Sequence, residues 1–457
     1  MDINTGIFRT YDIRGVFPDE INADVVYRIA RAYAALLHKE NPGRQLCVAL
    51  GRDMRSSSLE LFDAAQRGLL DSGIDAVGIG LVSTPTFYFA TAFYGYDGGM
   101  QVSASHNPKH FNGVKMTRAR AVPISGDTGI MEIRDMVIAN QFPDVSDKGV
   151  ATEKKGVLRE LVAEETKYWP IDRTRIKPFK VVVDAANAMG ALDIEAMFKG
   201  LPCELIKMNF ELDGSFPVHQ PDPMQEENMK ILQDAVLEHN ADIGIAPDGD
   251  GDRYFFVDEK GNIIRQEILR GMLAQDALRE HPNAAVAYDI RPGRITLDMI
   301  KEAGGRPILT RVGHSLIKES MLKENAVFGG ESSGHYFYQF PFGTFESPVV
   351  MVLRFLSIIS AIDKPISEII KPYQKYHNSG EINFDVADKE EKIKEIAAKY
   401  SDAQDISYLD GATITYDDFW FNVRPSNTES KLRLTLEAKT KELMEQKRDE
   451  VAAMIIA

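Results

Sequence analysis

The sequence predicts an α/β protein built from several domains. At 457 residues the chain is longer than the roughly 250 to 300 residues at which a single core stops growing, so three or four domains are expected. Short apolar runs alternate with helical periodicity, which is typical of mainly parallel sheets covered by helices. This alternation occurs three times before a shorter, antiparallel-looking segment begins. We therefore expect three similar α/β domains with mixed, mainly parallel sheets, followed by a smaller C-terminal α+β domain.

The first α/β segment shows the pattern clearly. Apolar residues recur at helical spacing from Ala23 to Lys39, and a second helix is expected from Ser58 to Asp71. Strand-like apolar runs are expected at 46–50, 76–81 and 98–103. The last of these runs leads directly into the polar sequence SASHNP.

Two later segments repeat this arrangement. Apolar strands end at Asp184 and at Asp289, as the strand at 46–50 runs on to Asp53. Each segment later has a strand that ends in a polar loop, IGIAPDGDGDR at 243–253 and VFGGESSGH at 327–335. Loops at the carboxyl ends of strands are where α/β sheets present ligand sites, so all three loops are candidates for chemistry.

The expected domain boundaries follow changes in the pattern. A polar stretch at 141–154 ends the first segment, and the second ends just after the acidic loop. Near residue 371 the pattern changes to strands at 382–386, 411–416, 420–423 and 431–437, with a helix at 389–400 and another at the end. The expected domains are 1–148, 149–255, 256–370 and 371–457.

Composition limits the classes of partner. The formal charge of −15 argues against broad affinity for nucleic acid or anionic membrane, because both favour a basic surface. No apolar run approaches the length of a membrane span, and the first residues lack a signal peptide, so a cytoplasmic protein is expected. Cys47 and Cys203 lack metal-ligand spacing and are expected to be buried core thiols.

The stretch from Gln101 to Met116, QVSASHNPKHFNGVKM, contains a candidate nucleophile. Small residues precede Ser105, and the turn-forming pair Asn107-Pro108 follows it, which leaves one hydroxyl at the tip of a bend. Lys115 lies ten residues further on and its ammonium could reach a group handled at Ser105. Serines in surface loops are common, so this stretch alone does not establish a nucleophile.

The acidic loop predicts a metal site. Asp248, Asp250 and Asp252 alternate with glycines, so their carboxylates point the same way and repel one another unless a cation neutralises them. Oxygen ligands of this kind favour Mg²⁺. A calcium loop would place a glutamate at its twelfth position, where Glu259 stands, but the apolar strand at 254–257 interrupts the ligand series. A solvated acidic turn is the remaining alternative.

Two further loops suit a phosphorylated sugar. GESSGH places Glu331 and Ser333 between glycines, where they can bind sugar hydroxyls. RPSNT offers a guanidinium, two hydroxyls and an amide for a phosphate, from Arg424, Ser426, Asn427 and Thr428. Either loop alone could be an ordinary polar turn. Arginines near the other strand ends, Arg14, Arg52 and Arg291, could help bind phosphate or could form structural ion pairs with Asp12, Asp53 and Asp289.

Taken together, these motifs resemble one known superfamily. SASHNP followed by NGVK, then DGDGDR, GESSGH and RPSNT, occur in the order found in the α-D-phosphohexomutases. FRTYDIRG and SNT are most similar to the bacterial and archaeal phosphomannomutase/phosphoglucomutase branch, whereas phosphoglucosamine mutases usually show TDGIRG and SGTEP. The family usually has proline where Ser430 follows the phosphate loop. The resemblance implies that the α/β domains face a central cleft.

The resemblance also implies roles for individual residues. Ser105 carries a phosphoryl group, and the expected catalytic residues are Ser105, Lys115, Arg253 and His335, with Lys115 and His335 as proton carriers. Mg²⁺ is expected on Asp248, Asp250 and Asp252 together with Ser105. The expected substrate-binding residues are Tyr11, Arg14, Arg291, His314, Glu331, Ser333, Arg424, Ser426, Asn427 and Thr428.

The expected activity is therefore interconversion of hexose 6-phosphate and hexose 1-phosphate, of mannose, glucose or both. Phospho-Ser105 would react through a hexose 1,6-bisphosphate, which also serves as activator. Phosphoglucosamine mutase is the nearest alternative, and a metal-dependent sugar phosphatase or a phosphosugar-binding protein is a more distant one. The expected partner is a small phosphosugar rather than nucleic acid or membrane, with the chain acting as a monomer or homodimer.

Overall fold

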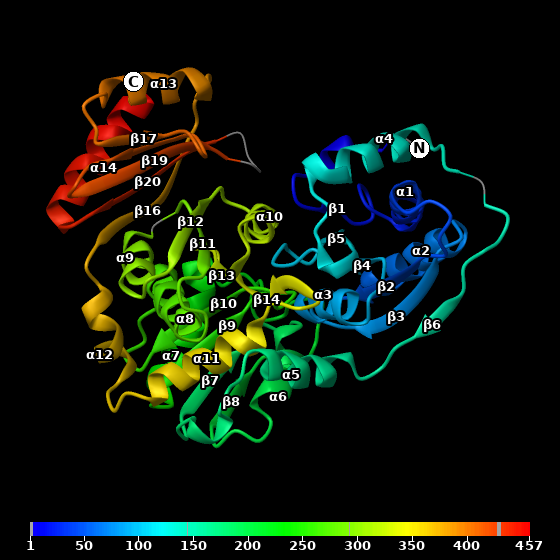
Figure 1. Ribbon diagram of the computed structural model, residues 1–457, viewed down its shortest axis with the longest axis horizontal. Coiled ribbons are helices and arrows are strands. Elements are labelled where there is room, and N and C mark those ends of the chain that lie inside the picture. Colours follow the sequence, from blue (N-terminus) through cyan, green and yellow to red (C-terminus); the bar gives the residue numbers. More distant parts are fainter. Residues whose placement is uncertain (1–2, 144, 292, 427–430) are drawn as a thin grey trace. The chain divides into compact units, whose positions relative to one another are not determined.

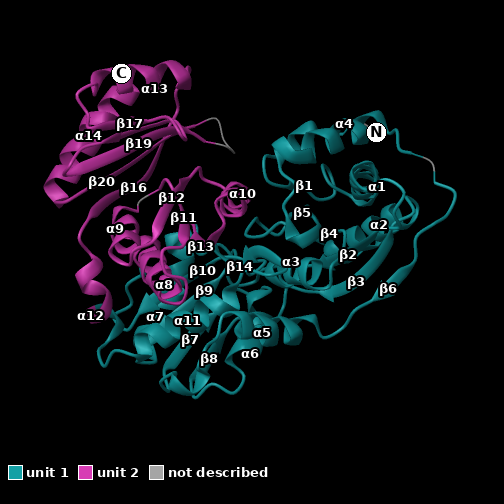
Figure 2. Ribbon diagram, in the orientation of Figure 1, with its two compact units in different colours: residues 1–264, 333–367 teal, residues 265–332, 368–457 magenta. Residues whose placement is uncertain are grey.

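The computed structural model describes residues 3–143, 145–291, 293–426 and 431–457. The chain divides into two compact units, which Figure 2 shows in teal and magenta. Unit 1 comprises residues 1–264 and 333–367, and unit 2 comprises residues 265–332 and 368–457. Each unit combines sheets with covering helices (Figure 1), as the alternation of strand and helix patterns predicts.

The first sheet of unit 1 is mixed. Its strand order is β1-β5-β4-β2-β3-β6. The strands are β1 (Ile13–Val16), β2 (Cys47–Arg52), β3 (Asp75–Leu81), β4 (Gly98–Val102), β5 (Phe111–Arg118) and β6 (Ala151–Glu153). Strands β4, β2, β3 and β6 are parallel, whereas β5 runs antiparallel to both β4 and β1. This pairing confirms the mixed, mainly parallel sheet.

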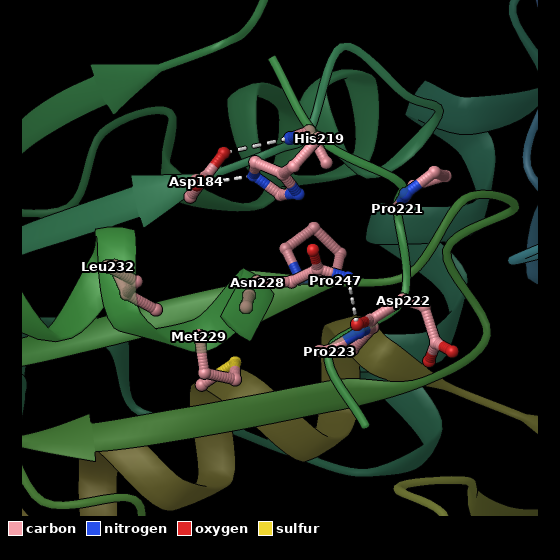
Figure 3. A pocket seen from close by; sticks show the side chains of 11 residues that line it. Asp184, His219, Pro221, Asp222, Pro223, Asn228, Met229, Leu232 and Pro247 are labelled. Carbon is pink, nitrogen blue, oxygen red and sulfur yellow. Dashed lines mark hydrogen bonds and ion pairs between the residues drawn. The ribbon is translucent and has the colours of Figure 1, made fainter. Parts of the chain in front are cut away.

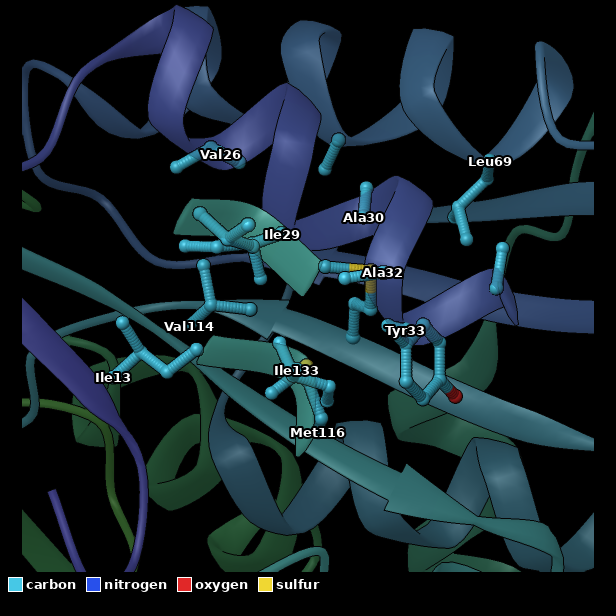
Figure 4. Close-up of a cluster of buried hydrophobic side chains, with 14 of the residues drawn as sticks. Ile13, Val26, Ile29, Ala30, Ala32, Tyr33, Leu69, Val114, Met116 and Ile133 are labelled. Carbon is cyan, nitrogen blue, oxygen red and sulfur yellow. The ribbon is translucent and has the colours of Figure 1, made fainter. Parts of the chain in front are cut away.

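Helix α1 (Ala23–Glu40) packs the core of this sheet. It begins where the Asn22 side chain accepts a hydrogen bond from the backbone N–H of Val25, which satisfies one of the free donors of the first turn. Its apolar face packs on side chains of β1 and β5 (Figure 4); Ile29 of the helix and Val114 of β5 are both fully buried. Truncating such a side chain to alanine costs about 2 to 5 kcal/mol.

The other helices of this part of unit 1 complete the layer and connect the strands. They are α2 (Ser58–Leu70), α3 (Thr84–Phe93) and α4 (Met131–Ala139). Helices α2 and α4 both pack against α1, whereas α3 packs against β2, β4 and a later strand, β15 (Gly343–Glu346). The expected helix from Ser58 to Asp71 is thus confirmed as α2.

The second sheet of unit 1 has the order β10-β9-β7-β8. Its strands are β7 (Lys180–Asp184), β8 (Glu204–Met208), β9 (Ile243–Pro247) and β10 (Tyr254–Asp258). Only β10 is antiparallel to its neighbour. The nearby elements are α5 (Val157–Tyr168), α6 (Gly190–Phe198), α7 (Glu226–Glu238), the hairpin β14 (Tyr336–Phe340) and β15 (Gly343–Glu346), and α11 (Pro348–Ser360).

Two edge strands lie beyond the expected domain boundaries, which stay predictions. Because β6 pairs with β3, the first sheet continues to Glu153, past the expected boundary at 148/149. Because β10 pairs with β9, the second sheet continues to Asp258, past the expected boundary at 255/256. In both cases a short strand at the edge of the sheet, β6 or β10, continues past the expected boundary.

Unit 2 contains a parallel group of strands and an antiparallel sheet. Strand β11 (Ala285–Asp289) lies between β12 (Arg306–Thr310) and β13 (Ala326–Gly330), with helices α8 (Gln266–Glu280), α9 (Arg294–Glu302) and α10 (His314–Glu324). Helix α12 (Ile366–Ile370) begins just before the chain enters the second segment of this unit. These elements correspond to the third strand-helix repeat of the sequence.

The C-terminal part of unit 2 is α+β, as expected. Its sheet has the order β16-β20-β19-β18-β17 and every neighbouring pair is antiparallel. The strands are β16 (His377–Phe384), β17 (Asp405–Ser407), β18 (Ala412–Thr415), β19 (Phe419–Pro425) and β20 (Leu432–Ala438). Helices α13 (Lys389–Lys399) and α14 (Lys441–Ile456) pack on it. Among the described residues no helix is long and apolar enough to cross a membrane.

Candidate active site

Ser105 follows β4 and meets the loop that follows β9. Its side chain is buried, with 1% of the residue exposed, and its Oγ donates a hydrogen bond of 2.8 Å to Asp248 Oδ2. Its backbone adopts φ 49°, a left-handed conformation that few residues other than glycine adopt. His106 Nδ1 lies 3.2 Å from the same hydroxyl. The expected exposed tip is therefore a buried, constrained turn that faces the acidic loop.

The three carboxylates of the acidic loop converge. Each of Asp248, Asp250 and Asp252 is buried and offers an oxygen, and these oxygens all lie within 4.8 Å of one another. Lys115 on β5 brings its ammonium to 2.6 Å from Asp250 Oδ2 and 2.7 Å from Asp252 Oδ2. Its partners in this structure are thus the carboxylates of the acidic loop, because β5 carries it alongside β4.

This charge distribution separates the pKa values of the carboxyls. Burial, together with the neighbouring carboxylates of Asp252 and Asp250, raises the pKa of Asp248 to about 8. Burial acts in the same direction on Asp252, but Lys115 and His335 outweigh it and hold the pKa of that carboxyl well below its usual range. Burial also opposes the charge on Lys115, yet Asp250 and Asp252 raise its pKa well above the ordinary value. Lys115 is therefore a fixed ammonium in this arrangement.

Thr84 holds the acidic loop in place, a role that the sequence does not predict. At the start of α3 its hydroxyl donates a 2.5 Å hydrogen bond to Asp250 Oδ2, and its backbone N–H donates one of 2.9 Å to the carbonyl of Asp250. Ser83, which caps the helix, donates 3.0 Å to the buried Asp193 Oδ1. The Ser-Thr-Pro sequence signals a helix start, but nothing local to it identifies a partner 166 residues away.

The acidic loop fits a small dication. All the donors are oxygens, the type that Mg²⁺ prefers, and they come from a single turn. Within the described residues, the buried Asp250 Oδ1 has no hydrogen-bond partner, so one ligand atom is not used by the protein. An uncompensated buried carboxylate oxygen is costly unless a cation or donor reaches it.

His335 joins the acidic loop from the residues that follow β13. Its Nε2 lies 3.1 Å from Asp252 Oδ1, and Arg253 Nε donates 3.3 Å to the same nitrogen. Its Nδ1 lies 3.1 Å from Ser333 Oγ. Because Nε2 can accept from Arg253 when unprotonated and donate to Asp252 when protonated, the imidazole keeps a partner in both states. The guanidinium of Arg253 also lies 3.9 Å from Asp248 Oδ2.

The N-terminal YDIRG sequence contacts the serine loop, the turn at residues 103–112 that carries Ser105. Arg14 donates 2.7 Å to Asp12 Oδ2 and 2.7 Å to the side chain of Asn107, in the turn behind Ser105. Tyr11 is partly buried three residues earlier. Of the two alternatives for Arg14, the structure shows the ion pair with Asp12, and phosphate binding stays a prediction.

Unit 2 carries the remaining predicted residues of the sugar loop. Glu331 is buried and accepts 2.8 Å from the backbone N–H of Gly313, directly before His314 at the start of α10. Arg291 Nε donates 2.5 Å to Asp289 Oδ2, and its Nη2 lies 3.7 Å from Glu331 Oε1. Glu331, Arg291 and the start of α10 thus lie together. Of the two alternatives for Arg291, the structure shows the ion pair with Asp289.

The predicted phosphate loop follows β19. Arg424 is buried and donates 2.5 Å to Glu381 Oε2 on β16, and Arg433 on β20 lies 3.1 Å from the other oxygen of that carboxylate. The backbone N–H of Ser426 donates 2.9 Å to the carbonyl of Lys431. Asn427 and Thr428 lie outside the described residues.

A small cavity in unit 1 has no room for a sugar. It measures about 10 Å³, room for one water, and lies between Asp184 and the stretch from His219 to Pro223 (Figure 3). His219 Nε2 is 2.9 Å from Asp184 Oδ2, and this pairing outweighs burial and raises the pKa of His219. In the same stretch, the carbonyl of Pro221 accepts a 3.1 Å hydrogen bond from the backbone N–H of Gly249 in the acidic loop. The residues around the cavity therefore support the acidic loop.

Comparison with known proteins assigns the family. The chain matches the phosphoglucomutase/phosphomannomutase α/β/α domains I, II and III at residues 5–144, 160–261 and 267–376, and the C-terminal domain at residues 381–454. These matches follow one another in the order of the sequence segments described above.

Individual relatives match along nearly the whole chain. A phosphomannomutase of Vibrio cholerae is 37% identical over 457 residues, covering 98% of each chain. The phosphohexose mutases of Xanthomonas campestris are 39% identical over 438 residues, covering 94% of this chain and 95% of theirs. A crystal structure of a phosphoglucomutase/phosphomannomutase family protein from Burkholderia thailandensis, 31% identical, superposes with a TM-score of 0.89 and covers 99% of this chain and 97% of its own. The chain therefore belongs to the phosphoglucomutase/phosphomannomutase family of the α-D-phosphohexomutase superfamily and is an intramolecular phosphotransferase.

Proposed function

We propose that this enzyme interconverts hexose 6-phosphates and hexose 1-phosphates, of both mannose and glucose, through phospho-Ser105 and a hexose 1,6-bisphosphate. The observation that supports this most directly is the 2.8 Å hydrogen bond from Ser105 Oγ to Asp248, inside a buried cluster of three carboxylates and one ammonium. A buried hydroxyl at a constrained turn, next to a dication site, is the arrangement that phosphoryl transfer to and from serine requires.

In the proposed reaction the free hydroxyl of the sugar attacks the phosphorus on Ser105. For a hexose 1-phosphate, the bond from O6 to phosphorus forms, the bond from Ser105 Oγ to phosphorus breaks, and the proton of O6 leaves to a base. As Ser105 Oγ leaves it takes up a proton, and the resulting 1,6-bisphosphate then turns over. Oγ gives that proton to a base and bonds to the phosphorus at C1, while the bond from O1 to this phosphorus breaks and O1 takes up a proton. This second transfer releases hexose 6-phosphate and restores the phosphoserine.

The residues of unit 1 divide this work. Asp248, Asp250 and Asp252, with Ser105, would hold Mg²⁺, which supplies charge neutralisation of the transferring phosphoryl oxygens. Lys115 would supply a second positive charge beside the carboxylates, and we assign the base role to His335. Both ring nitrogens of His335 have partners, which fixes the orientation of the imidazole.

We assign substrate recognition mainly to the sugar loop at 330–335 and to the phosphate loop that begins at Arg424. Glu331 and Ser333 would bind sugar hydroxyls, and Arg291, His314, Arg424 and Ser426 would bind the phosphate that is not transferred. In this structure Arg424 is already paired with Glu381, so a phosphate must compete with that carboxylate. Tyr11 and Arg14 would border the serine loop. A cytoplasmic location and a monomeric or homodimeric state stay predictions.

The test is a set of coupled assays with mannose, glucose and glucosamine 1-phosphates, with Mg²⁺ and hexose 1,6-bisphosphate, and with release of inorganic phosphate measured in parallel. We expect turnover of the mannose and glucose substrates with little phosphate release, and phosphate on Ser105 by peptide mass analysis after incubation with the bisphosphate. Preference for glucosamine phosphate would indicate a phosphoglucosamine mutase, stoichiometric phosphate release would indicate a phosphatase, and binding without turnover would refute the proposal.

A further inference from the structure

Arg55 lies behind the serine loop and contacts its backbone at four points. Its Nη2 donates 2.8 Å to the carbonyl of Ser105 and 2.6 Å to that of Asn107. Its Nη1 donates 2.8 Å to the carbonyl of Pro108 and 3.0 Å to that of Phe111. One guanidinium therefore binds the turn from Ser105 to Phe111 along its whole length.

The surroundings of Arg55 fix the guanidinium itself. Only 2% of the residue is exposed, and Asp53 Oδ2 lies 3.3 Å from its Nε. The ring of Phe216, from the loop before Pro221, lies 5.0 Å from the guanidinium carbon. Asp53 also accepts 2.5 Å from Ser58, whose hydroxyl accepts from the side chain of Asn112. A buried, paired arginine of this kind has one orientation, and its planar fork carries that orientation to the carbonyls it binds.

The turn that Arg55 binds needs such support. Ser105 has φ 49°, a left-handed backbone conformation that is unfavourable for a residue with a Cβ unless its surroundings hold it there. Its carbonyl is confined on its other side by Gly249, since a Cβ there would lie 2.3 Å from the oxygen. The Ser105 carbonyl thus lies between Arg55 and the acidic loop, and its position determines where the hydroxyl points.

From this geometry we infer that Arg55 is the positioning residue for the nucleophile of the proposed phosphotransfer. It binds neither the sugar nor the phosphoryl group. It holds the Ser105 turn in the left-handed conformation that brings Oγ to Asp248, so its loss lowers the rate of phosphoryl transfer and leaves substrate binding almost unchanged. The inference rests on the proposed phosphoserine mechanism and adds a residue that acts through Ser105.

The test compares Arg55→Ala and Arg55→Lys with Arg173→Ala, a matched control. Arg173 also donates to two backbone carbonyls, those of Met197 at 2.7 Å and Lys199 at 2.8 Å, but it does not contact the serine loop. Lysine keeps the charge of Arg55 but offers its donors from a single nitrogen, so it cannot reach all four carbonyls.

We expect Arg55→Ala to lower kcat and the rate of Ser105 phosphorylation by about a hundredfold or more, and Arg55→Lys by about tenfold, with KM changed less than about threefold. Guanidinium ion, added well below denaturing concentrations, should restore at least about tenfold of the rate in Arg55→Ala and none in Arg173→Ala. Structural damage alone would not be repaired by a small cation. A kcat for Arg55→Lys within about twofold of the natural enzyme, or no rescue of folded Arg55→Ala, would overturn the inference.

A second measurement does not depend on the activity. Hydrogen exchange of peptides covering residues 103–112 should be faster in Arg55→Lys than in the natural protein, while peptides from the second sheet stay unchanged. Unchanged exchange in 103–112 would also overturn the inference. If the natural enzyme shows no mutase activity at all, the proposed function fails, and the exchange result still decides whether Arg55 orders this turn.

Discussion

Lys115→Met should expose how strongly the acidic loop depends on its ammonium. In the structure this ammonium lies 2.6 Å from Asp250 and 2.7 Å from Asp252, and the three side chains are only 5%, 0% and 2% exposed. Solvent therefore screens the pair little, and removing one partner of such a buried pair costs about 3 to 5 kcal/mol. At about 2 to 4 °C per kcal/mol for a unit of this size, the melting temperature should fall by roughly 6 to 20 °C.

The assay is scanning calorimetry of the natural protein and the variant, each with chelator and with excess Mg²⁺. Because the variant leaves the carboxylates without their ammonium, Mg²⁺ should raise its melting temperature more than that of the natural protein. Lys148→Met is the matched control. Its ammonium lies 2.6 Å from Asp71 but is 77% exposed and screened by solvent, so its removal should leave the melting temperature almost unchanged.

Two results would contradict this reasoning. If Lys115→Met in chelator melts within about 2 °C of the natural protein, the ion pairs are not a significant source of stability. If Mg²⁺ raises both melting temperatures equally, the ammonium and the cation do not act on the same carboxylates.

Further predictions concern other parts of unit 1. Thr84→Val removes the hydroxyl that is bonded to Asp250 at 2.5 Å, so the Mg²⁺ concentration needed for half-maximal activity should rise by about tenfold or more. Thr84→Ser keeps the hydroxyl and should need the same Mg²⁺ concentration as the natural enzyme. Equal half-maximal concentrations for the two variants would contradict the assigned role. Ser105→Ala should take up no phosphate from hexose 1,6-bisphosphate and should lose mutase activity, measured by peptide mass analysis and coupled assay. Burial raises the pKa of Glu165 well above its usual range, despite a hydrogen bond from Ser347, so the folded protein holds a proton that the unfolded chain releases. Stability of the natural protein should therefore fall as pH rises above about 4.3, by at most about 1.4 kcal/mol per pH unit, and the Glu165→Gln variant should lack this slope; parallel melting curves from pH 5 to 8 would refute it.

The fold class and the chemical loops could be predicted because their signals are local. Apolar runs and helical periodicity identify strands and helices: the helix expected at 23–39 and the strands expected at 76–81 and 98–103 match α1, β3 and β4 to within one residue. The alternation of aspartate and glycine in DGDGDR similarly predicts convergent carboxylates from one turn, and the superfamily inferred from these motifs is confirmed.

Side-chain partners were much less predictable, because they depend on register between distant strands. Asp53 was expected to pair with an arginine nearby, and Arg52 is its neighbour in sequence. The structure instead pairs Asp53 with Arg55, because Arg52 is the last residue of β2 and donates only to the backbone carbonyl of Asp53. Spacing places Lys115 within reach of a group handled at Ser105 but does not identify its partners, which in the structure are Asp250 and Asp252.

The uneven compensation of the three aspartates indicates where a cation gains most. Asp252 contacts both Lys115 and His335, and Asp250 contacts Lys115 and Thr84. Asp248, by contrast, has no ammonium contact: it accepts from the Ser105 hydroxyl at 2.8 Å and from the backbone N–H groups of Asp252 and Arg253, and a guanidinium lies only at 3.9 Å. Burial raises its pKa to about 8. A dication held by the three carboxylates would favour the ionised form of Asp248 and would lie beside Ser105, where a phosphoryl group would carry its negative charge.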